Sequence, residues 1–315
     1  MNSINNLIEA FKRGDRVALG RLLKEVENGT SSSYKLLKQA GLNKGGAHVV
    51  GITGPPGAGK STLVGQLCKS WAEQGLKLGV ICVDPSSPFS GGALLGDRIR
   101  MQELSKLPDV FIKSLATRGS LGGLAASAAD IIRLMDGFGK DLIIVETVGV
   151  GQIEYDVLDI ADTVVLVNVP GLGDSLQTMK AGIMEIADLY VINQSDRPGA
   201  SESVRDLQLM IHERERGDWE PAILQTVATQ KKGILELKEA IELHKAHLQQ
   251  SGLWDKKRQE RNWKRLRSMI NELLSNKVKE YINSNEQIAQ CIAEVRDGRL
   301  DPYTAAQAIV AEIVK

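Results

Sequence analysis

Residues 48–61 read HVVGITGPPGAGKS, an apolar run followed by the complete motif G-x-x-x-x-G-K-[ST]. The apolar run predicts a buried strand and a helix is predicted from Ser61, which is the strand–loop–helix setting of a phosphate-binding loop. Glycines let the backbone N–H groups of such a loop point inward around a phosphate, and the helix N-terminus adds positive potential. The alternative is a glycine-rich turn without a ligand. The residues expected to bind nucleotide here are Gly54, Gly57, Ala58, Gly59, Lys60, Ser61 and Thr62.

Two residues of this loop have further chemical roles. Lys60 would place its ammonium on the terminal phosphates as a catalytic group, and the Ser61 hydroxyl would bind Mg²⁺. An apolar strand that ends in Glu146 supplies the acidic residue expected on the metal side, also counted as catalytic. Asp84 and Asp97 are further candidates for the metal, with helix capping or a turn as the alternative role.

A second motif predicts which base the site reads. Asn193-Gln194-Ser195-Asp196 follows a predicted strand and is close to the Asn-Lys-x-Asp with which GTPases read guanine. Asp196 would accept hydrogen bonds from the ring N–H and the exocyclic amine of guanine, which adenine cannot satisfy. Gln194 replaces the lysine, so we expect weaker affinity with specificity retained; the alternative for Asn193 and Asp196 is an Asx turn. Two residues of a later loop would lie beneath the base: Val227 and Ala228.

The segment after the metal-side glutamate departs from the common Asp-x-x-Gly pattern of GTPases. The chain has Glu-x-x-Gly, and Gly149 keeps the backbone N–H that senses the γ-phosphate. Ras-type GTPases orient the attacking water with a Gln directly after this glycine, whereas this chain has Val150. We therefore expect slow hydrolysis by the isolated protein. Gln152 is the nearest replacement for the glutamine, and Arg98 and Lys180 are candidates for a cationic finger.

Short apolar runs alternate with helical segments through the middle of the chain. Runs that are apolar on both faces and separated by helices are typical of a mostly parallel sheet covered on two sides. We therefore predict an α/β fold, a P-loop GTPase domain built on a mostly parallel sheet. The predicted strands span residues 48–52, 78–83, 110–113, 142–146, 163–168, 189–193 and 222–224.

Helical extensions are predicted on both sides of this domain. Apolar residues recur at helical spacing over residues 7–26 with a break at Gly14, and the strands stop after Gly233. Residues 254–282 predict an amphipathic helix spanning about 40 Å, a length that favours a role between subunits over packing on its own domain. The expected parts are a helical N-terminal extension (1–44), the GTPase domain (45–250) and a C-terminal helical dimerisation arm (251–315).

Composition and charge exclude several other classes. The 315 residues are 43% hydrophobic and 25% charged, ordinary values for a globular protein. Lys and Arg total 39, as do Asp and Glu, so net charge does not favour nucleic acid or anionic lipid. The apolar runs are too short to cross a bilayer, the first residues lack a signal peptide, and the scattered cysteines fit reduced thiols. We expect a cytoplasmic protein that binds neither nucleic acid nor a membrane.

Together these motifs resemble the MeaB/MMAA-type G proteins, which include chains known as ArgK or LAO/AO transport kinases. The resemblance runs nearly end to end and includes residues 46–57, 84–88, 96–98, 146–152 and 177–183. It implies a homodimer that uses GTP or GDP with Mg²⁺. It further implies a chaperone that gates adenosylcobalamin loading and protects or repairs a cobalamin-dependent acyl-CoA mutase of the methylmalonyl-CoA mutase type. A switch segment would link nucleotide and mutase through Asp174, Gln177 and Lys180.

Three alternatives stay open on the sequence. A metal-delivery GTPase for another metalloenzyme would share the loop and add His or Cys ligands, for which His244 and His247 are the nearest candidates. A small-molecule kinase would need a dedicated acceptor pocket. A helical scaffold with a degenerate nucleotide site is opposed by the intact Lys60, Ser61 and Glu146.

Overall fold

The computed structural model describes residues 2–28, 36–39, 46–84, 102–116, 123–147, 159–171, 187–212 and 218–313. The chain divides into two compact units, residues 1–257 and 258–315. The expected N-terminal extension, GTPase domain and C-terminal dimerisation arm stay a prediction. Several residues named above lie outside the described residues: Asp97, Arg98, Gly149, Val150, Gln152, Asp174, Gln177 and Lys180.

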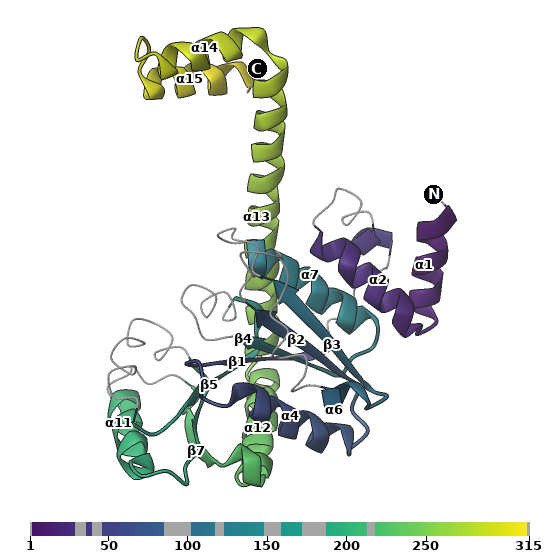
Figure 1. The fold of residues 1–315 in the computed structure, drawn as a ribbon, viewed down its shortest axis with the longest axis vertical. Coiled ribbons are helices and arrows are strands. Elements are labelled where there is room, and N and C mark those ends of the chain that lie inside the picture. Colours follow the sequence, from purple (N-terminus) through teal and green to yellow (C-terminus); the bar gives the residue numbers. More distant parts are fainter. Residues whose placement is uncertain are drawn as a thin grey trace. The chain divides into compact units, whose positions relative to one another are not determined.

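Seven parallel strands form one sheet in the described part of the chain (Figure 1). All residues of the strands β4, β1, β5 and β6 are buried, which explains why these strands read as continuous apolar runs. The predicted strands are confirmed, with small differences at their carboxyl ends. In order across the sheet they are β3 (Val110–Ala116), β2 (Leu78–Asp84), β4 (Leu142–Thr147), β1 (His48–Thr53), β5 (Thr163–Asn168), β6 (Leu189–Asn193) and β7 (Ala222–Thr226).

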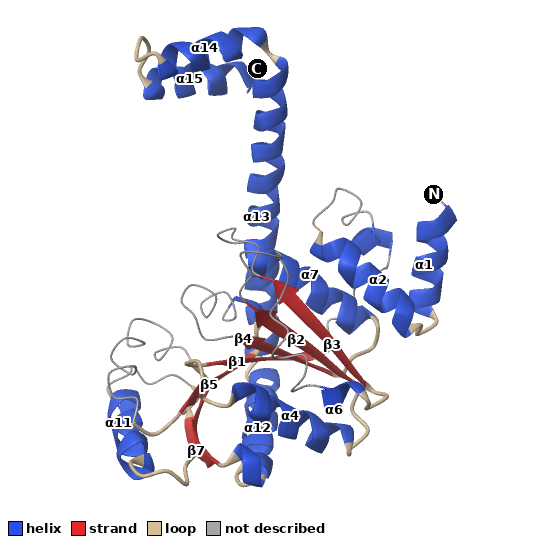
Figure 2. Cartoon of the chain, in the orientation of Figure 1, coloured by secondary structure: helices blue, strands red, loops and turns tan. Residues whose placement is uncertain are grey.

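Helices cover both faces of this sheet (Figure 2). One face packs against α4 (Lys60–Ala72), α6 (Gln102–Ser105) and α12 (Ile234–Gln250). The other face packs against α2 (Arg16–Glu27), α7 (Gly123–Gly137) and α11 (Ala200–His212). The side chain of Trp71 in α4 is fully buried, and its Nε1 donates a hydrogen bond of 3.0 Å to Glu242 of α12. The predicted α/β fold with a mostly parallel sheet is therefore confirmed.

The N-terminal helical hairpin consists of α1 (Asn2–Lys12) and α2, and α2 packs on α7. Gly14 adopts a φ of 86° in the connection, a conformation that favours glycine. The carboxylate of Asp15 then accepts hydrogen bonds from the backbone N–H groups of Val17 and Ala18, at 2.7 and 3.1 Å. This N-cap starts α2 immediately after the turn, as the break in the apolar pattern predicts.

A buried polar network joins α12 to the strand ends opposite the phosphate loop. Thr163 Oγ1, at the start of β5, lies 2.8 Å from both His48 Nε2 and His244 Nδ1. His244 Nε2 lies 3.3 Å from Asp188 Oδ1, and Lys257 Nζ lies 3.6 Å from the same oxygen. Burial lowers the pKa of His244 to about 4, so its ring is neutral at pH 7. A neutral ring that donates to Asp188 from Nε2 accepts at Nδ1, so the Thr163 hydroxyl donates to His244 and accepts from His48.

The C-terminal helices are α13 (Leu253–Ser284), α14 (Glu286–Arg296) and α15 (Pro302–Ile313). Within the second unit, α14 packs against α15, with Ile288 and Ala305 buried. Asp301 caps α15 by accepting from the backbone N–H of Tyr303 at 2.8 Å, and hydrogen bonds from Thr304 and Tyr303 lower the pKa of this carboxyl. Among the described residues, no helix is long and apolar enough to span a membrane.

Candidate nucleotide-binding site

The phosphate loop connects the carboxyl end of β1 to the first turn of α4. Gly54, Gly57 and Gly59 adopt φ values of 142°, 77° and 81°, which side chains rarely tolerate. A Cβ atom on Gly54 would lie 2.0 Å from the carbonyl oxygen of Val167 in β5, so the loop passes directly against that strand. The glycine spacing of the motif is therefore a backbone requirement at this position.

Lys60 lies at the start of α4 and reaches back over the loop. Its side chain is only 6% exposed, and Nζ donates to the carbonyl oxygens of Gly54 at 2.6 Å and Pro55 at 2.9 Å. These bonds hold the ammonium at the loop, where phosphate oxygens can replace the two carbonyl acceptors.

Ser61 and Glu146 are in direct contact. Ser61 Oγ donates a hydrogen bond of 2.6 Å to Glu146 Oε1. The contact forms because β1 and β4 are neighbours, with Ile52 opposite Glu146 in the register, so the end of β4 lies beside the loop that follows β1. Asp84 ends β2, which pairs with the other edge of β4.

A hydroxyl and a carboxylate oxygen at this distance fit the ligands that Mg²⁺ prefers, since the ion usually takes one or two protein oxygens together with phosphates and water. In the described ranges no group of three His, Cys, Asp or Glu side chains could by itself hold a metal ion. Cys68 of α4 does not compete as a ligand, because burial, reinforced by the nearby Glu146 carboxylate, raises its thiol pKa well above the usual value.

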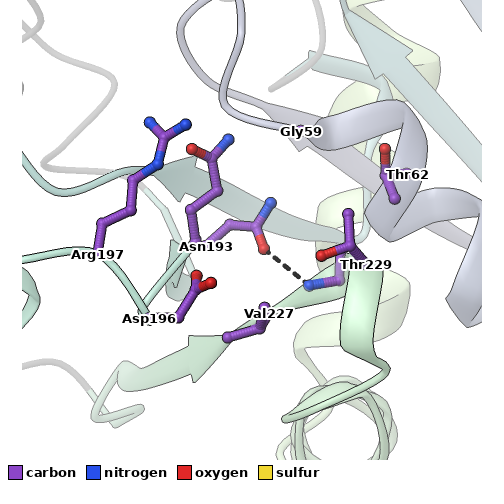
Figure 3. A pocket seen from close by; sticks show the side chains of 9 residues that line it. Gly59, Thr62, Asn193, Asp196, Arg197, Val227 and Thr229 are labelled. Carbon is purple, nitrogen blue, oxygen red and sulfur yellow. Dashed lines mark hydrogen bonds between the residues drawn. The ribbon is translucent and has the colours of Figure 1, made fainter.

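A pocket of about 260 Å³ lies beyond the phosphate loop, at the carboxyl ends of β6 and β7 (Figure 3). It combines backbone from the start of α4 with side chains from the two loops that follow these strands. Its lining residues are Gly59, Thr62, Asn193, Gln194, Asp196, Arg197, Val227, Ala228 and Thr229.

Asn193 ties the phosphate loop to the wall of this pocket. Its side chain is 2% exposed, and Nδ2 donates to the carbonyl oxygen of Ala58 at 2.8 Å. Its Oδ1 accepts from Thr226 Oγ1 at 3.0 Å and from the backbone N–H of Ala228 at 3.2 Å, the bond drawn in Figure 3. A Cβ on Gly59 would lie 2.5 Å from Asn193 Nδ2, so this contact also depends on a glycine.

Gln194 and Asp196 complete the predicted base motif. Gln194 has a φ of 56°, and its Nε2 donates to the carbonyl oxygen of Gly57 at 3.0 Å, so the substitution for lysine keeps a contact with the phosphate loop. The Asp196 carboxylate is exposed and lies at the pocket, 3.5 Å from Gln230 Nε2. A carboxylate in this setting is available to donors on a ligand.

The structure brings the described site residues to one edge of the sheet, the carboxyl ends of β1, β4, β6 and β7. Val227 and Ala228 line the same pocket as Asp196, and their place beneath a base stays a prediction. Thr226 belongs to the loop that the sequence places beneath the base, but the sequence interpretation gave it no role of its own, and it missed Arg197, which follows Asp196. It also missed the contact between Asn193 and Ala58, since nothing local in the sequence pairs these residues.

A family model described as "Methylmalonyl Co-A mutase-associated GTPase MeaB" matches residues 19–283. The chain belongs to this family. A putative GTPase of Pyrococcus horikoshii is 49% identical over 318 residues, covering 100% of this chain and 99% of its relative. The mouse protein called methylmalonic aciduria type A homolog, mitochondrial, is 39% identical over 269 residues, covering 83% of this chain and 64% of that protein.

A crystal structure of an LAO/AO transport system kinase has a TM-score of 0.74 to this chain at 27% identity, covering 100% of this chain and 99% of that one. The predicted P-loop GTPase fold and the resemblance to MeaB-type G proteins are therefore confirmed. As a MeaB-family protein with relatives named GTPases, the protein is a GTPase and binds guanine nucleotides.

Proposed function

We propose that this GTPase gates adenosylcobalamin loading into a cobalamin-dependent acyl-CoA mutase of the methylmalonyl-CoA mutase type, and protects or repairs that enzyme. The observation that supports this most directly is the extent of the family match. Residues 19–283 include most of α2 and nearly all of α13 in addition to the nucleotide site. GTP hydrolysis itself requires the phosphate loop and its surroundings rather than these helices. The family model therefore includes helices that hydrolysis does not need, and this supports a partner protein that is common to the family.

GTP would bind across both halves of the site. The phosphates of GTP would lie on residues 54–62, where the Lys60 ammonium would bind phosphate oxygens in place of its two carbonyl acceptors. The guanine base would contact Asp196. Mg²⁺ would be held by Ser61 and Glu146, with Asp84 as a further candidate. When bound, the ion neutralises charge that develops on the transferring phosphoryl group.

Residues outside the described ranges complete this proposal and stay predictions. Near the phosphates they are Asp97, Gly149 and Gln152. The switch between nucleotide and mutase would comprise Asp174, Gln177 and Lys180.

Steady-state GTP hydrolysis with and without a purified adenosylcobalamin-dependent methylmalonyl-CoA mutase tests the proposal. We expect the mutase to raise the rate by about ten- to a hundredfold, below the ~10³–10⁵ gained from a complete arginine finger. The Lys180→Ala variant should keep the basal rate and lose the stimulation. A rate that no such mutase changes would contradict the proposal, and an unchanged stimulated rate in Lys180→Ala would remove that residue from it.

The metal-delivery alternative depends on exposed metal ligands. The nearest candidates, His244 and His247, instead contact other side chains of this protein. His244 is buried and contacts Thr163 and Asp188. The rings of His244 and His247 also pack against Trp219, with centroids 4.6 and 5.1 Å away. These contacts favour a packing role for both histidines over metal transfer.

We further propose that the protein is a homodimer joined through α13. Four apolar side chains of the second unit follow the 3-4-3 spacing of a coiled-coil seam, and each is at least 46% exposed: Trp263, Leu266, Ile270 and Leu273. A second copy of the chain is the natural partner, because a two-fold axis brings the same seam from both copies together.

Light scattering coupled to size-exclusion chromatography tests the dimer. The Ile270→Glu variant should elute as a monomer, because it places a charge on the seam. The Lys279→Glu variant changes an exposed residue on the opposite side of α13 and should remain a dimer. A monomeric parent protein, or a dimeric Ile270→Glu protein, would contradict this arrangement.

A further inference from the structure

The turn after β6 holds two side chains of opposite charge at the base pocket. Its backbone is fixed at both sides, since Ser195 N–H donates to the carbonyl oxygen of Thr226 at 3.1 Å and Arg197 N–H donates to that of Gln194 at 3.0 Å. Asp196 and Arg197 are therefore presented from one hydrogen-bonded turn, and both line the pocket. In Figure 3 the Arg197 side chain extends away from the Asp196 carboxylate and from Val227.

Gln194 leaves part of this pocket without the cover that a lysine would provide. Its amide is engaged with the phosphate loop through the hydrogen bond to Gly57. A glutamine has a shorter aliphatic stem than lysine and no charge, so it can cover less of a flat ligand while it makes this bond. Any further cover has to come from a neighbouring side chain on the same side of the pocket.

Arg197 has the properties that this role needs. Among the described residues that line the pocket it is the only cationic one, and its side chain is exposed. Within the described part of the chain its guanidinium makes no ion pair or hydrogen bond, and only its backbone is engaged. A guanidinium is planar, weakly hydrated and stacks readily on aromatic faces.

We propose that Arg197 is an affinity-determining residue of the nucleotide site, whose guanidinium stacks on the face of the guanine base that Gln194 leaves uncovered. The base edge is read by Asp196 and the base face is covered by Arg197, so one turn supplies both contacts. This inference rests on the proposed binding of guanine at Asp196. Arg197, directly after the Asn193–Asp196 motif, would then pack on the base as the lysine stem does in Asn-Lys-x-Asp.

Calorimetric titration of the full chain with GMP and with GDP tests the stacking. The Arg197→Ala variant should bind both nucleotides about three- to tenfold more weakly, by the same factor for each, because the lost contact is to the base. The Arg197→Tyr variant keeps a planar face without the charge and should bind within about twofold of the parent protein. The Arg205→Ala variant, at an exposed position of α11, should leave binding unchanged.

Two results would overturn this inference. One is unchanged binding in Arg197→Ala. The other is a loss that is larger for GDP than for GMP, shrinks at high salt and persists in Arg197→Tyr, which would assign Arg197 to the phosphates instead. Failure of the proposed guanine site is distinguishable, because the parent protein would then bind GDP and ADP equally, whatever residue stands at position 197.

Discussion

Ser61 Oγ donates a hydrogen bond of 2.6 Å to Glu146 Oε1, so the first turn of α4 meets the end of β4. The two residues are far apart in the sequence, and the parallel pairing of β1 with β4 brings them together. A serine hydroxyl beside a carboxylate fits the metal side of a phosphate-binding loop. The contact also explains why the acidic residue lies on β4, the strand directly beside β1.

The Glu146→Gln variant should separate nucleotide binding from turnover. The glutamine keeps the hydrogen bond from Ser61 but loses the negative charge that attracts Mg²⁺, so we expect GDP to bind within about tenfold of the parent and GTP hydrolysis to fall by about a hundredfold. The Lys60→Ala variant should lose both properties. Titration and phosphate release measure them, with Glu239→Gln on the exposed side of α12 as the control. Parental turnover in Glu146→Gln would reject Glu146 as a metal-side residue.

The Gly54→Ala variant should destabilise the protein and weaken nucleotide binding. The added Cβ would lie 2.0 Å from the backbone oxygen of Val167, at a φ of 142°, so the loop or β5 must move. We expect the free energy of unfolding to fall by about 2–5 kcal/mol. Gly65→Ala is a matched control inside α4, because its Cβ meets nothing within 4 Å and alanine favours a helix. Denaturant unfolding that gives both variants the same stability would contradict the steric argument.

The buried His244 should make stability depend on pH below neutrality. Its pKa is lowered to about 4 from an ordinary value of 6.5, first by burial and then by Lys257 and His247, against the opposing effect of Asp188 and Asp162. The unfolded chain therefore binds more protons between these two values. Stability from this group is complete above pH 6.5 and is lost as pH falls toward 4, by an amount on the order of 1–3 kcal/mol.

Urea unfolding between pH 4 and pH 7 measures this dependence. The His244→Gln variant should be less stable at pH 7, because it loses contacts with Thr163 and Asp188, but its stability should fall less steeply on acidification. The His212→Gln variant, at the exposed end of α11, should keep the parental slope. An unchanged slope in His244→Gln would assign the pH dependence to other groups.

The sequence predicts the strands and helices well, because parallel strands buried on both faces leave continuous apolar runs. It also points to most residues of the candidate site, since the phosphate loop and the base motif are local patterns with a known chemistry, and the roles of these residues stay predictions. It does not predict strand order or register, and so it cannot show that Glu146 contacts Ser61. The same limit applies to Asn193, whose partners Ala58 and Thr226 come from two other segments.

The buried network around Thr163 is another feature that the sequence does not predict. His48, Thr163 and His244 read as unrelated polar residues, because their positions in the chain are far apart. In the folded protein Thr163 Oγ1 lies 2.8 Å from a ring nitrogen of each histidine. Burial of the network lowers the pKa of His244. Such a network follows from tertiary structure alone.

The Asp196→Asn variant should change which base the site prefers. An asparagine amide presents a donor where the carboxylate has an acceptor, and xanthine has a carbonyl in place of the exocyclic amine of guanine. We expect GDP binding to weaken by about tenfold or more and xanthosine diphosphate to become the better ligand. Competition titration of the two nucleotides measures the change, and Asp206→Asn, at an exposed position of α11, is the control.

Guanine selectivity is tested most directly by calorimetric titration of the parent protein with GDP and with ADP in the presence of Mg²⁺. Because Asp196 lies at the pocket as an available carboxylate, we expect GDP to bind at least about tenfold more tightly than ADP. Equal affinity for the two nucleotides would contradict the assignment of this pocket to the guanine base.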